Sequence, residues 1–301
     1  MTRQKQYEQA IGSRLQSAQG LAALEGYLLA ESGLPGPRAN LELAGALAQV
    51  CGQRVMDSED WTLLKQWATL DESEAPTNDP HVFLPFCALQ AMAALFPQLD
   101  PQRRAAVVSA LRQAANDGRW RLREAAAMAV QRIAEWDWPS ACAILSDWLE
   151  TATLLEQRAI VAALAHPPIL LDAERTSFCL RVSDRILCAV AALGGPARRS
   201  ADFRVLAKGL MYALSVFVAV APVEGFAFLN RWAAAEDPDI RRIVRANLGK
   251  ARLARRYPAR VAEVLAVLEA TGAPSAPANR RRGVGVNERG PLPLDETYPF
   301  G

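Results

Sequence analysis

Residues 116–134, NDGRWRLREAAAMAVQRIA, carry the pattern that decides the fold of this chain. Asp117 opens a polar turn, and from Leu122 onward the apolar side chains recur at the spacing of one helix face. Residues 236–261, EDPDIRRIVRANLGKARLARRYPARV, repeat this order of turn and helix. The pattern Leu-x-x-Trp closes a predicted helix three times, at Leu64/Trp67, Leu145/Trp148 and Leu229/Trp232. These spacings equal about two units of ~40 residues, so helix pairs recur and must stack on one another to bury their apolar faces.

The two quoted stretches resemble repeats of bacterial HEAT-like repeat proteins. In HEAT repeats an aspartate lies in the turn between the two helices, and an arginine lies early in the second helix. Asp117 with Arg123, and Asp237 with Arg241, occupy these positions. The resemblance covers residues 58–270 and implies an all-α fold, a right-handed superhelix of stacked antiparallel helix pairs (a HEAT-like α-α solenoid). Its basis is repeat shape, which says much about a fold and little about a function.

The composition also favours helices along the chain. Of 301 residues, 51% are hydrophobic and 56 are alanine, the residue with the highest helix propensity. No segment shows the alternation of a strand, and we expect helices at about 5–30, 38–53, 58–70, 81–96, 101–116, 119–135, 139–151, 154–165, 172–193, 200–220, 222–235, 238–254 and 258–270. These form a helical repeat domain over residues 1–270. Residues 271–301 are rich in proline, glycine and arginine and show no helical period, so we interpret them as a C-terminal tail.

The sequence predicts a cytoplasmic protein without a membrane partner. The first residues, MTRQKQYEQAIGSRLQ, contain no apolar run of the signal-peptide type. The longest uncharged stretch, Gly209–Val223, is shorter than the ~20 residues that a membrane-spanning helix needs, so we interpret it as a buried helix. The five cysteines form no Cys-x-x-Cys pair, which favours reduced thiols.

Motifs of ordinary enzyme chemistry are missing from the sequence. The two histidines, His81 and His166, lie in different predicted repeats, and there is no His-x-x-x-His, Cys-x-x-Cys or calcium-loop pattern. Gly283-Val284-Gly285 is an isolated fragment in the tail and is not a phosphate-binding loop. The sequence therefore predicts no metal and no cofactor.

A short aromatic and acidic segment, EWDW at residues 135–138, has two interpretations. A carboxylate between two indoles, with Trp120 one helix upstream, is able to hold a cationic group or an alkylated base. The chain more distantly resembles the helical-repeat DNA glycosylases of alkylation repair, which hold a catalytic aspartate and flanking aromatics on a basic concave face. That resemblance makes Asp137 the candidate catalytic residue, with Trp136 and Trp138 as candidate binding residues. In the other interpretation, Asp137 simply caps the next helix.

Basic residues gather near the end of the predicted repeats, although the net charge of the chain is only +2. Residues 237–282 contain eleven basic and four acidic side chains, a difference of seven. A helix over 238–256 places four arginines near one face: Arg241, Arg245, Arg252 and Arg256. A second basic patch, interleaved with Trp120, consists of Arg119, Arg121 and Arg123. Such patches bind nucleic-acid phosphates in a salt-dependent way, or else the arginines form a structural ladder with turn aspartates.

Three hypotheses of function follow from these observations. The first is a non-enzymatic HEAT-repeat scaffold that binds a macromolecular partner, above all another protein, on its concave face. The second is a DNA-binding protein of the alkylation-repair type, a base-excising glycosylase in its strongest form. The third is a sensor of a small ligand in the same groove. The scaffold requires an apolar or mixed groove, whereas DNA binding requires arginines from several repeats on one continuous face.

Overall fold

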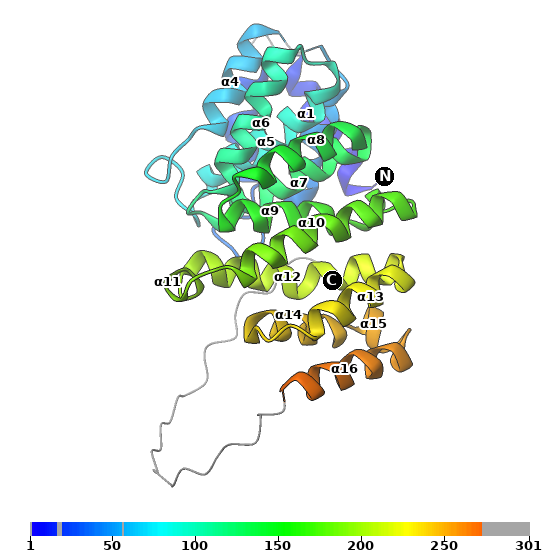
Figure 1. Ribbon diagram of the computed structural model, residues 1–301. Helices are drawn as coiled ribbons and strands as arrows, with labels where there is room; N and C mark the ends of the chain where they lie inside the picture. Colours follow the sequence, from blue (N-terminus) through cyan, green and yellow to red (C-terminus); the bar gives the residue numbers. More distant parts are fainter. Residues whose placement is uncertain (1, 17–19, 56, 273–301) are drawn as a thin grey trace.

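The structure, a computed structural model, describes residues 2–16, 20–55 and 57–272, and every regular element in this part of the chain is a helix (Figure 1). The α-helices are α1 (Arg3–Leu15), α2 (Glu25–Ala30), α3 (Leu41–Gly52), α4 (Ser58–Ala68), α5 (Phe83–Leu95), α6 (Pro101–Ala115), α7 (Trp120–Trp136), α8 (Trp138–Glu150), α9 (Leu154–Leu164), α10 (Ala173–Ala191), α11 (Gly195–Arg198), α12 (Ala201–Val220), α13 (Pro222–Ala233), α14 (Pro238–Leu248), α15 (Ala251–Ala254) and α16 (Pro258–Gly272). Four 3-10 helices are η1 (Gly20–Leu24), η2 (Pro80–Val82), η3 (Phe96–Gln98) and η4 (Pro167–Ile169). The prediction of an all-α chain is confirmed.

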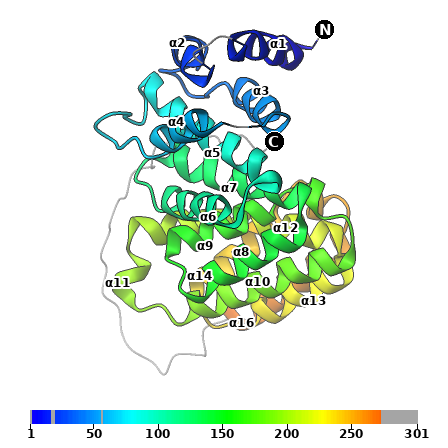
Figure 2. The same cartoon turned by 90° about the horizontal axis from the view of Figure 1, so that it is seen from above.

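The helices form two series, in which most members alternate along the chain and neighbours in the first series pack on one another. One series runs through the molecule, each member in contact with the next: α1, α3, α5, α7, α9, α12, α14 and α16. A second series, α4, α6, α8, α10 and α13, packs against the first. Figure 1 shows α1 and α4 at one end of the molecule and α16 at the other, and Figure 2 shows the same molecule from above. Each helix pair therefore buries its apolar side chains against its neighbours.

Two helical segments are long and apolar enough to satisfy the length and composition of a membrane span, residues 80–98 and 201–220. In these segments 78% and 56% of the apolar window is buried inside the molecule, respectively. The helix α5 shows why: twelve of its thirteen residues are buried because α3, α4 and α7 all contact it. Largely buried apolar helices also form the cores of soluble proteins, and the structure is compatible with a soluble protein.

The Leu-x-x-Trp pairs lie near the ends of α4, α8 and α13, and all three leucines are buried. Trp67 and Trp148 are also buried, with 3% and 1% of their surface exposed. Trp232 is only half-buried, and its indole nitrogen Nε1 donates a hydrogen bond to Oδ1 of Asp184 at 2.9 Å. The repeated tryptophan is therefore a core residue in two helix pairs and a boundary residue in the third.

Aspartates begin most helices of the second series. The carboxylates of Asp57, Asp100, Asp137 and Asp172 cap α4, α6, α8 and α10, each accepting a hydrogen bond from the backbone N–H three residues later at 2.8–3.1 Å. Such a cap satisfies one of the N–H groups that a helix start leaves without a partner. Prolines at the first or second helical position of α6, α8 and α13 lack an N–H that would need one.

The predicted helix over residues 5–30 is broken. The helix α1 ends at Leu15, and Gly20 has a positive φ of 53°. A Cβ atom at Gly20 would lie 2.6 Å from Oδ1 of Asp60, the atom that accepts a hydrogen bond from the Leu21 amide at 2.9 Å. The chain therefore turns here with a conformation and a close approach that favour glycine.

The predicted helix over residues 238–254 is also broken, because α14 ends at Leu248. Gly249, a poor helix former, follows, and Lys250 has an extended backbone with ψ 133°. The buried Asn247 fixes this end to α12, since its Oδ1 accepts from the Ser215 amide at 2.8 Å and its Nδ2 donates to the Leu210 carbonyl at 2.9 Å. At the C-terminal end, α16 extends to Gly272, and the rest of the predicted tail, 273–301, lies outside the described residues.

Candidate binding groove

The three residues of the Trp-Asp-Trp cluster have separate contacts. Asp137 caps α8 and also accepts from the Ser140 hydroxyl at 2.6 Å, and the hydrogen bonds from Ser140 hold the pKa of Asp137 below its ordinary range. Trp138 packs edge-on against Phe178, with ring centres 5.6 Å apart, whereas Trp136 is 74% exposed. Asp137 therefore has the capping role that the second interpretation of this segment gave it.

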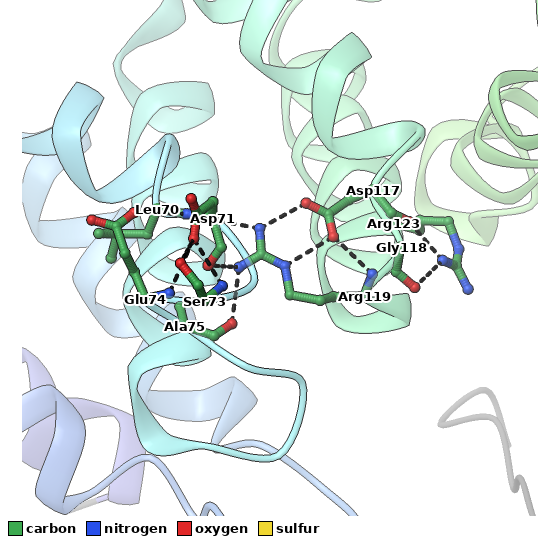
Figure 3. Close-up of polar contacts among 9 residues, drawn as sticks. All are labelled: Leu70, Asp71, Ser73, Glu74, Ala75, Asp117, Gly118, Arg119 and Arg123. Atoms are coloured by element: carbon green, nitrogen blue, oxygen red, sulfur yellow. Dashed lines mark hydrogen bonds and ion pairs between the residues drawn. The ribbon is translucent and has the colours of Figure 1, made fainter.

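Arg119 is 3% exposed and holds two turns together (Figure 3). Its guanidinium pairs with the Asp117 carboxylate at 2.7 Å. It also donates to the backbone carbonyls of Leu70, Asp71 and Ala75 at 2.8–3.0 Å. These carbonyls belong to the connection between α4 and α5, so Arg119 joins the α6–α7 turn to the turn of the preceding helix pair. The N–H groups of its guanidinium therefore donate to groups inside the protein. The sequence had predicted instead an exposed arginine that contacts phosphates.

Arg123 binds backbone carbonyls of the turn, whereas the structural-ladder interpretation paired it with a turn aspartate. Its Nη1 donates to the backbone carbonyls of Asp117 and Gly118 at 2.7 and 2.8 Å, as Figure 3 shows. The Asp117 carboxylate is instead bound by Arg119. The aspartate therefore marks the turn as predicted, but its arginine is a different one.

The four arginines predicted on one helix face are separated, because the chain turns after α14. Arg241 donates to a backbone carbonyl of α16. Arg252 lies over the ring of Tyr212, with its guanidinium carbon 4.7 Å from the ring centre, and donates to the Tyr212 hydroxyl at 2.9 Å. The remaining two, Arg245 and Arg256, are exposed. The predicted row therefore divides into two arginines bonded within the protein and two that face solvent.

Two further arginines also join helix pairs close to their turns, although no sequence pattern singled them out: Arg112 lies at the end of α6 and Arg198 at the end of α11. Arg112 pairs with Glu156 at 2.8 Å, and Arg198 pairs with Asp237 and with Asp239, the latter at 3.0 Å. Each acidic partner follows its arginine by 39 to 44 residues, which is about one helix pair. This spacing between an arginine and an acidic residue is the sequence signal that could have identified these ion pairs. Arg112, Arg119 and Arg198 are called the inter-turn arginines below.

A groove of about 780 Å³ lies where the starts of α3 and α7 meet α1 and the connection between α2 and α3. Trp120, Glu124 and Met128 follow one another by four residues along α7, so they share the helix face that lines this groove. Phe86 of α5 and Leu41 of α3 add further apolar surface. Of the residues predicted to bind a partner, Trp120 and Arg121 line the groove.

One wall of the groove, the loop over residues 31–40, is held by hydrogen bonds. The Asn40 side chain donates to the Glu31 carbonyl, and its backbone N–H donates to the Ser32 carbonyl, at 2.9 and 2.8 Å. From the opposite side, Nη2 of Arg121 donates to the loop carbonyl of Gly36 at 2.6 Å. A wall that is already ordered loses little conformational freedom when a ligand binds.

Arg121 is 4% exposed, so it differs from the exposed patch residue that the sequence predicted. Besides Gly36, it binds the carbonyl of Thr77 through Nε at 3.2 Å. Its guanidinium carbon lies 4.4 Å from the centre of the Trp120 ring. Burial lowers the pKa of Arg121. A buried guanidinium at a groove is a costly group, and its surroundings decide what the groove accepts.

The groove has a mixed lining. Three basic residues, Arg3, Arg38 and Arg121, and three acidic residues, Glu31, Glu42 and Glu124, line it beside the apolar side chains. Nε of Arg3 lies 3.6 Å from Oε2 of Glu42, and the buried carboxylate of Glu124 forms an ion pair with Arg158 of α9. The groove therefore offers apolar and charged side chains side by side.

Across residues 2–16, 20–55 and 57–272, no group of three or more His, Cys, Asp or Glu side chains is placed to hold a metal ion. Burial raises the pKa of the Cys51 thiol to about 12 and that of Cys142 to about 11. These two thiols are therefore protonated, and poor nucleophiles, at neutral pH.

We compared the chain with protein families, with curated proteins and with solved structures. No family model and no curated protein matches the chain. Among solved structures, it is similar to two crystal structures of engineered proteins from the Northeast Structural Genomics Consortium, each 15% identical in sequence. The first match covers 86% of this chain and 97% of the other with a TM-score of 0.35, and the second covers 82% and 97% with a TM-score of 0.32.

Proposed function

We propose that this chain is a non-enzymatic scaffold that binds a protein partner in the groove between α1, α3, α5 and α7. The observation that carries the proposal is the combination of volume, mixed lining and ordered walls in one place. Trp120, Met128 and Phe86 offer apolar surface, while charged side chains surround them. Protein interfaces have this composition, with aromatic, methionine and arginine side chains enriched where a partner is buried.

We further propose that the two series of helices form an α-solenoid of the HEAT type. Supporting this proposal, the first series is an unbroken chain of contacts from α1 to α16. The inter-turn arginines add a second repeated feature, because each lies in or next to the turn of one helix pair and binds a group in or next to the turn of another. Units of this kind depend on their nearest neighbours for stability and present extended surfaces to partners.

Two matched leucine variants test the proposed binding site. Leu41 and Leu171 are both exposed, at 38% and 71%, but only Leu41 lines the groove. Leu41→Asp places a charge in the groove at the first position of α3, where an acidic residue suits the helix dipole. Wild type and Leu171→Asp, used as bait in a lysate of the source organism, are expected to retain the same proteins, and Leu41→Asp is expected to lose them. Equal retention by both variants would reject the groove as the binding site.

Nucleic-acid binding stays the alternative proposal, supported by three exposed arginines of the last helix pair: Arg245, Arg255 and Arg256. A salt titration of binding to a short fluorescent DNA duplex separates it from the scaffold proposal. Binding that weakens steeply with salt, and weakens again when these three arginines are replaced by alanine, would favour DNA. The absence of binding at low salt would favour the protein partner.

A further inference from the structure

Arg121 is a buried cation without an acidic partner. Its Nε and Nη2 donate to neutral backbone carbonyls, those of Thr77 and Gly36. Among the described residues, no carboxylate forms an ion pair with it, and its Nη1 donates no hydrogen bond. A desolvated charge costs free energy unless an opposite charge compensates it, and Arg121 lines a groove that a ligand can enter.

The charged side chains that line the groove with Arg121 have partners of opposite charge or are exposed to solvent. Glu42 is paired with Arg3 on the rim, and the buried Glu124 is paired with Arg158, which lies outside the lining. Of the remaining lining charges, Glu31 and Arg38 are exposed and opposite in sign. The lining thus holds three basic and three acidic residues, and because Glu124 is paired with Arg158 and Glu42 with Arg3, the buried Arg121 is left without an ion pair to a lining carboxylate.

Apolar side chains lie beside this charge. Trp120 stacks on the guanidinium, and Met128 and Phe86 line the same groove. A ligand that suits both features has one negative charge next to a bulky apolar group. A carboxylate brings a single negative charge to the single unpaired guanidinium of Arg121, and arginine binds carboxylates with strong charge-assisted hydrogen bonds.

We infer that the groove recognises a partner segment in which a carboxylate, bound by Arg121, stands next to a bulky apolar side chain that packs on Trp120, Met128 and Phe86. The inference rests on the proposed function and adds to it the chemical class of the partner. It treats Arg121 as the residue that selects the ligand by charge, and the α7 face as the surface that supplies apolar contact.

Small probes test the charge preference without knowledge of the partner. The full-length chain, labelled with 5-fluorotryptophan, is titrated with 3-phenylpropionate, its neutral amide, 2-phenylethylammonium and phenyl phosphate. The resonance of Trp120, assigned with a Trp120→Phe variant, is the readout, because it reports on the groove and not on other sites. We expect a saturable shift with 3-phenylpropionate and binding at least about tenfold weaker with the amide, since a hydrogen bond between two charged groups is stronger than one to a neutral amide.

Two arginine variants complete the test. Arg121→Gln should remove the preference for the acid over the amide, and Arg38→Gln, the same change at an exposed arginine of the groove, should keep it. If Arg121→Gln does not fold, the comparison of acid and amide on the wild-type protein decides by itself. Equal binding of acid and amide, stronger binding of the ammonium or the phosphate, or no shift at all would overturn the inference. If Leu41→Asp nevertheless loses its protein partner, the proposed function stands and only the carboxylate preference falls.

Discussion

The turn before α7 and the turn before α14 each contain an aspartate, and the two aspartates bind arginines that lie in opposite directions along the chain. Asp117 pairs with Arg119 of its own turn, and Arg119 reaches back to the carbonyls of the preceding helix pair. Asp237 instead receives Arg198 from the preceding connection, 39 residues earlier. Both arrangements join consecutive helix pairs. The comparison shows that a turn aspartate identifies the turn and leaves open which arginine binds it.

The two arginines also differ in burial. The side chain of Arg119 is 4% exposed, whereas that of Arg198 is 18% exposed. A more deeply buried arginine leaves more unsatisfied partners behind when it is removed, since water reaches them less easily. The comparison therefore predicts an order of effects.

The largest effect is expected for Arg119→Ala. This change leaves the carbonyls of Leu70, Asp71 and Ala75 and the Asp117 carboxylate without their buried donor, and it should lower the free energy of unfolding by about 3–5 kcal/mol. Urea denaturation followed by circular dichroism measures the loss. Arg255→Ala, at an exposed arginine, is the control and should stay within about 0.5 kcal/mol of wild type. A similar small change for both variants would contradict the structural role of Arg119.

A smaller loss, about 2 kcal/mol, is expected for Arg198→Ala, because its hydrogen bonds to charged groups are partly accessible to water. Its pH dependence sharpens the comparison. Burial raises the pKa of Asp237, but hydrogen bonds from Arg198 and from two backbone amides, together with the charge of Arg198, outweigh this and lower the pKa below its ordinary value of 3.8. Stability from such a lowered pKa is present above the unfolded-state value and is lost as the pH falls through the folded-state value.

The difference in stability between wild type and Arg198→Ala should therefore be largest near pH 7 and shrink as the pH falls below about 4. Urea titrations at several pH values measure it. Arg198 also donates hydrogen bonds to the backbone carbonyls of Val190, Ala191 and Leu193. A difference that stays constant down to pH 2 would mean that Arg198 stabilises the fold through these bonds alone.

The smallest effect is expected for Asp137→Ala, where the aspartate acts within a single turn and joins no helix pairs. Loss of the cap of α8 should cost about 1 kcal/mol, and Asp137→Asn should cost less, because asparagine is also a good cap. Thermal denaturation of the two variants measures both effects. If the alanine variant is as stable as wild type, the capping role of Asp137 is wrong.

Much of the helical structure could be predicted from local patterns. The Asp-Pro at residues 100–101 and the Leu-x-x-Trp pairs correctly marked helix starts and ends, because caps and apolar periodicity act over a few residues. The breaks at Gly20 and Gly249 were not predicted. Each depends on a contact between distant segments, with Asp60 at the first and with α12 through Asn247 at the second.

The candidate site was predicted only in part. Trp120 and Arg121 stood out in the sequence as a basic and aromatic pair, and both line the groove. Sequence alone did not show that Arg121 is buried, because its partners, the carbonyls of Gly36 and Thr77, lie 85 and 44 residues away. Leu41 and Phe86 carried no signal at all, since isolated apolar residues are common in helices.

The sequence by itself determined that the described part of this protein is helical, because propensity, capping and periodicity are local properties of the chain. Only the tertiary structure decided which arginine binds which turn and where a groove opens. A guanidinium such as that of Arg119 or Arg121 takes as partners whatever carbonyls and carboxylates the packing of neighbouring helix pairs brings within reach. Whether an arginine joins two turns, lines a groove or faces solvent is therefore a property of the assembled fold.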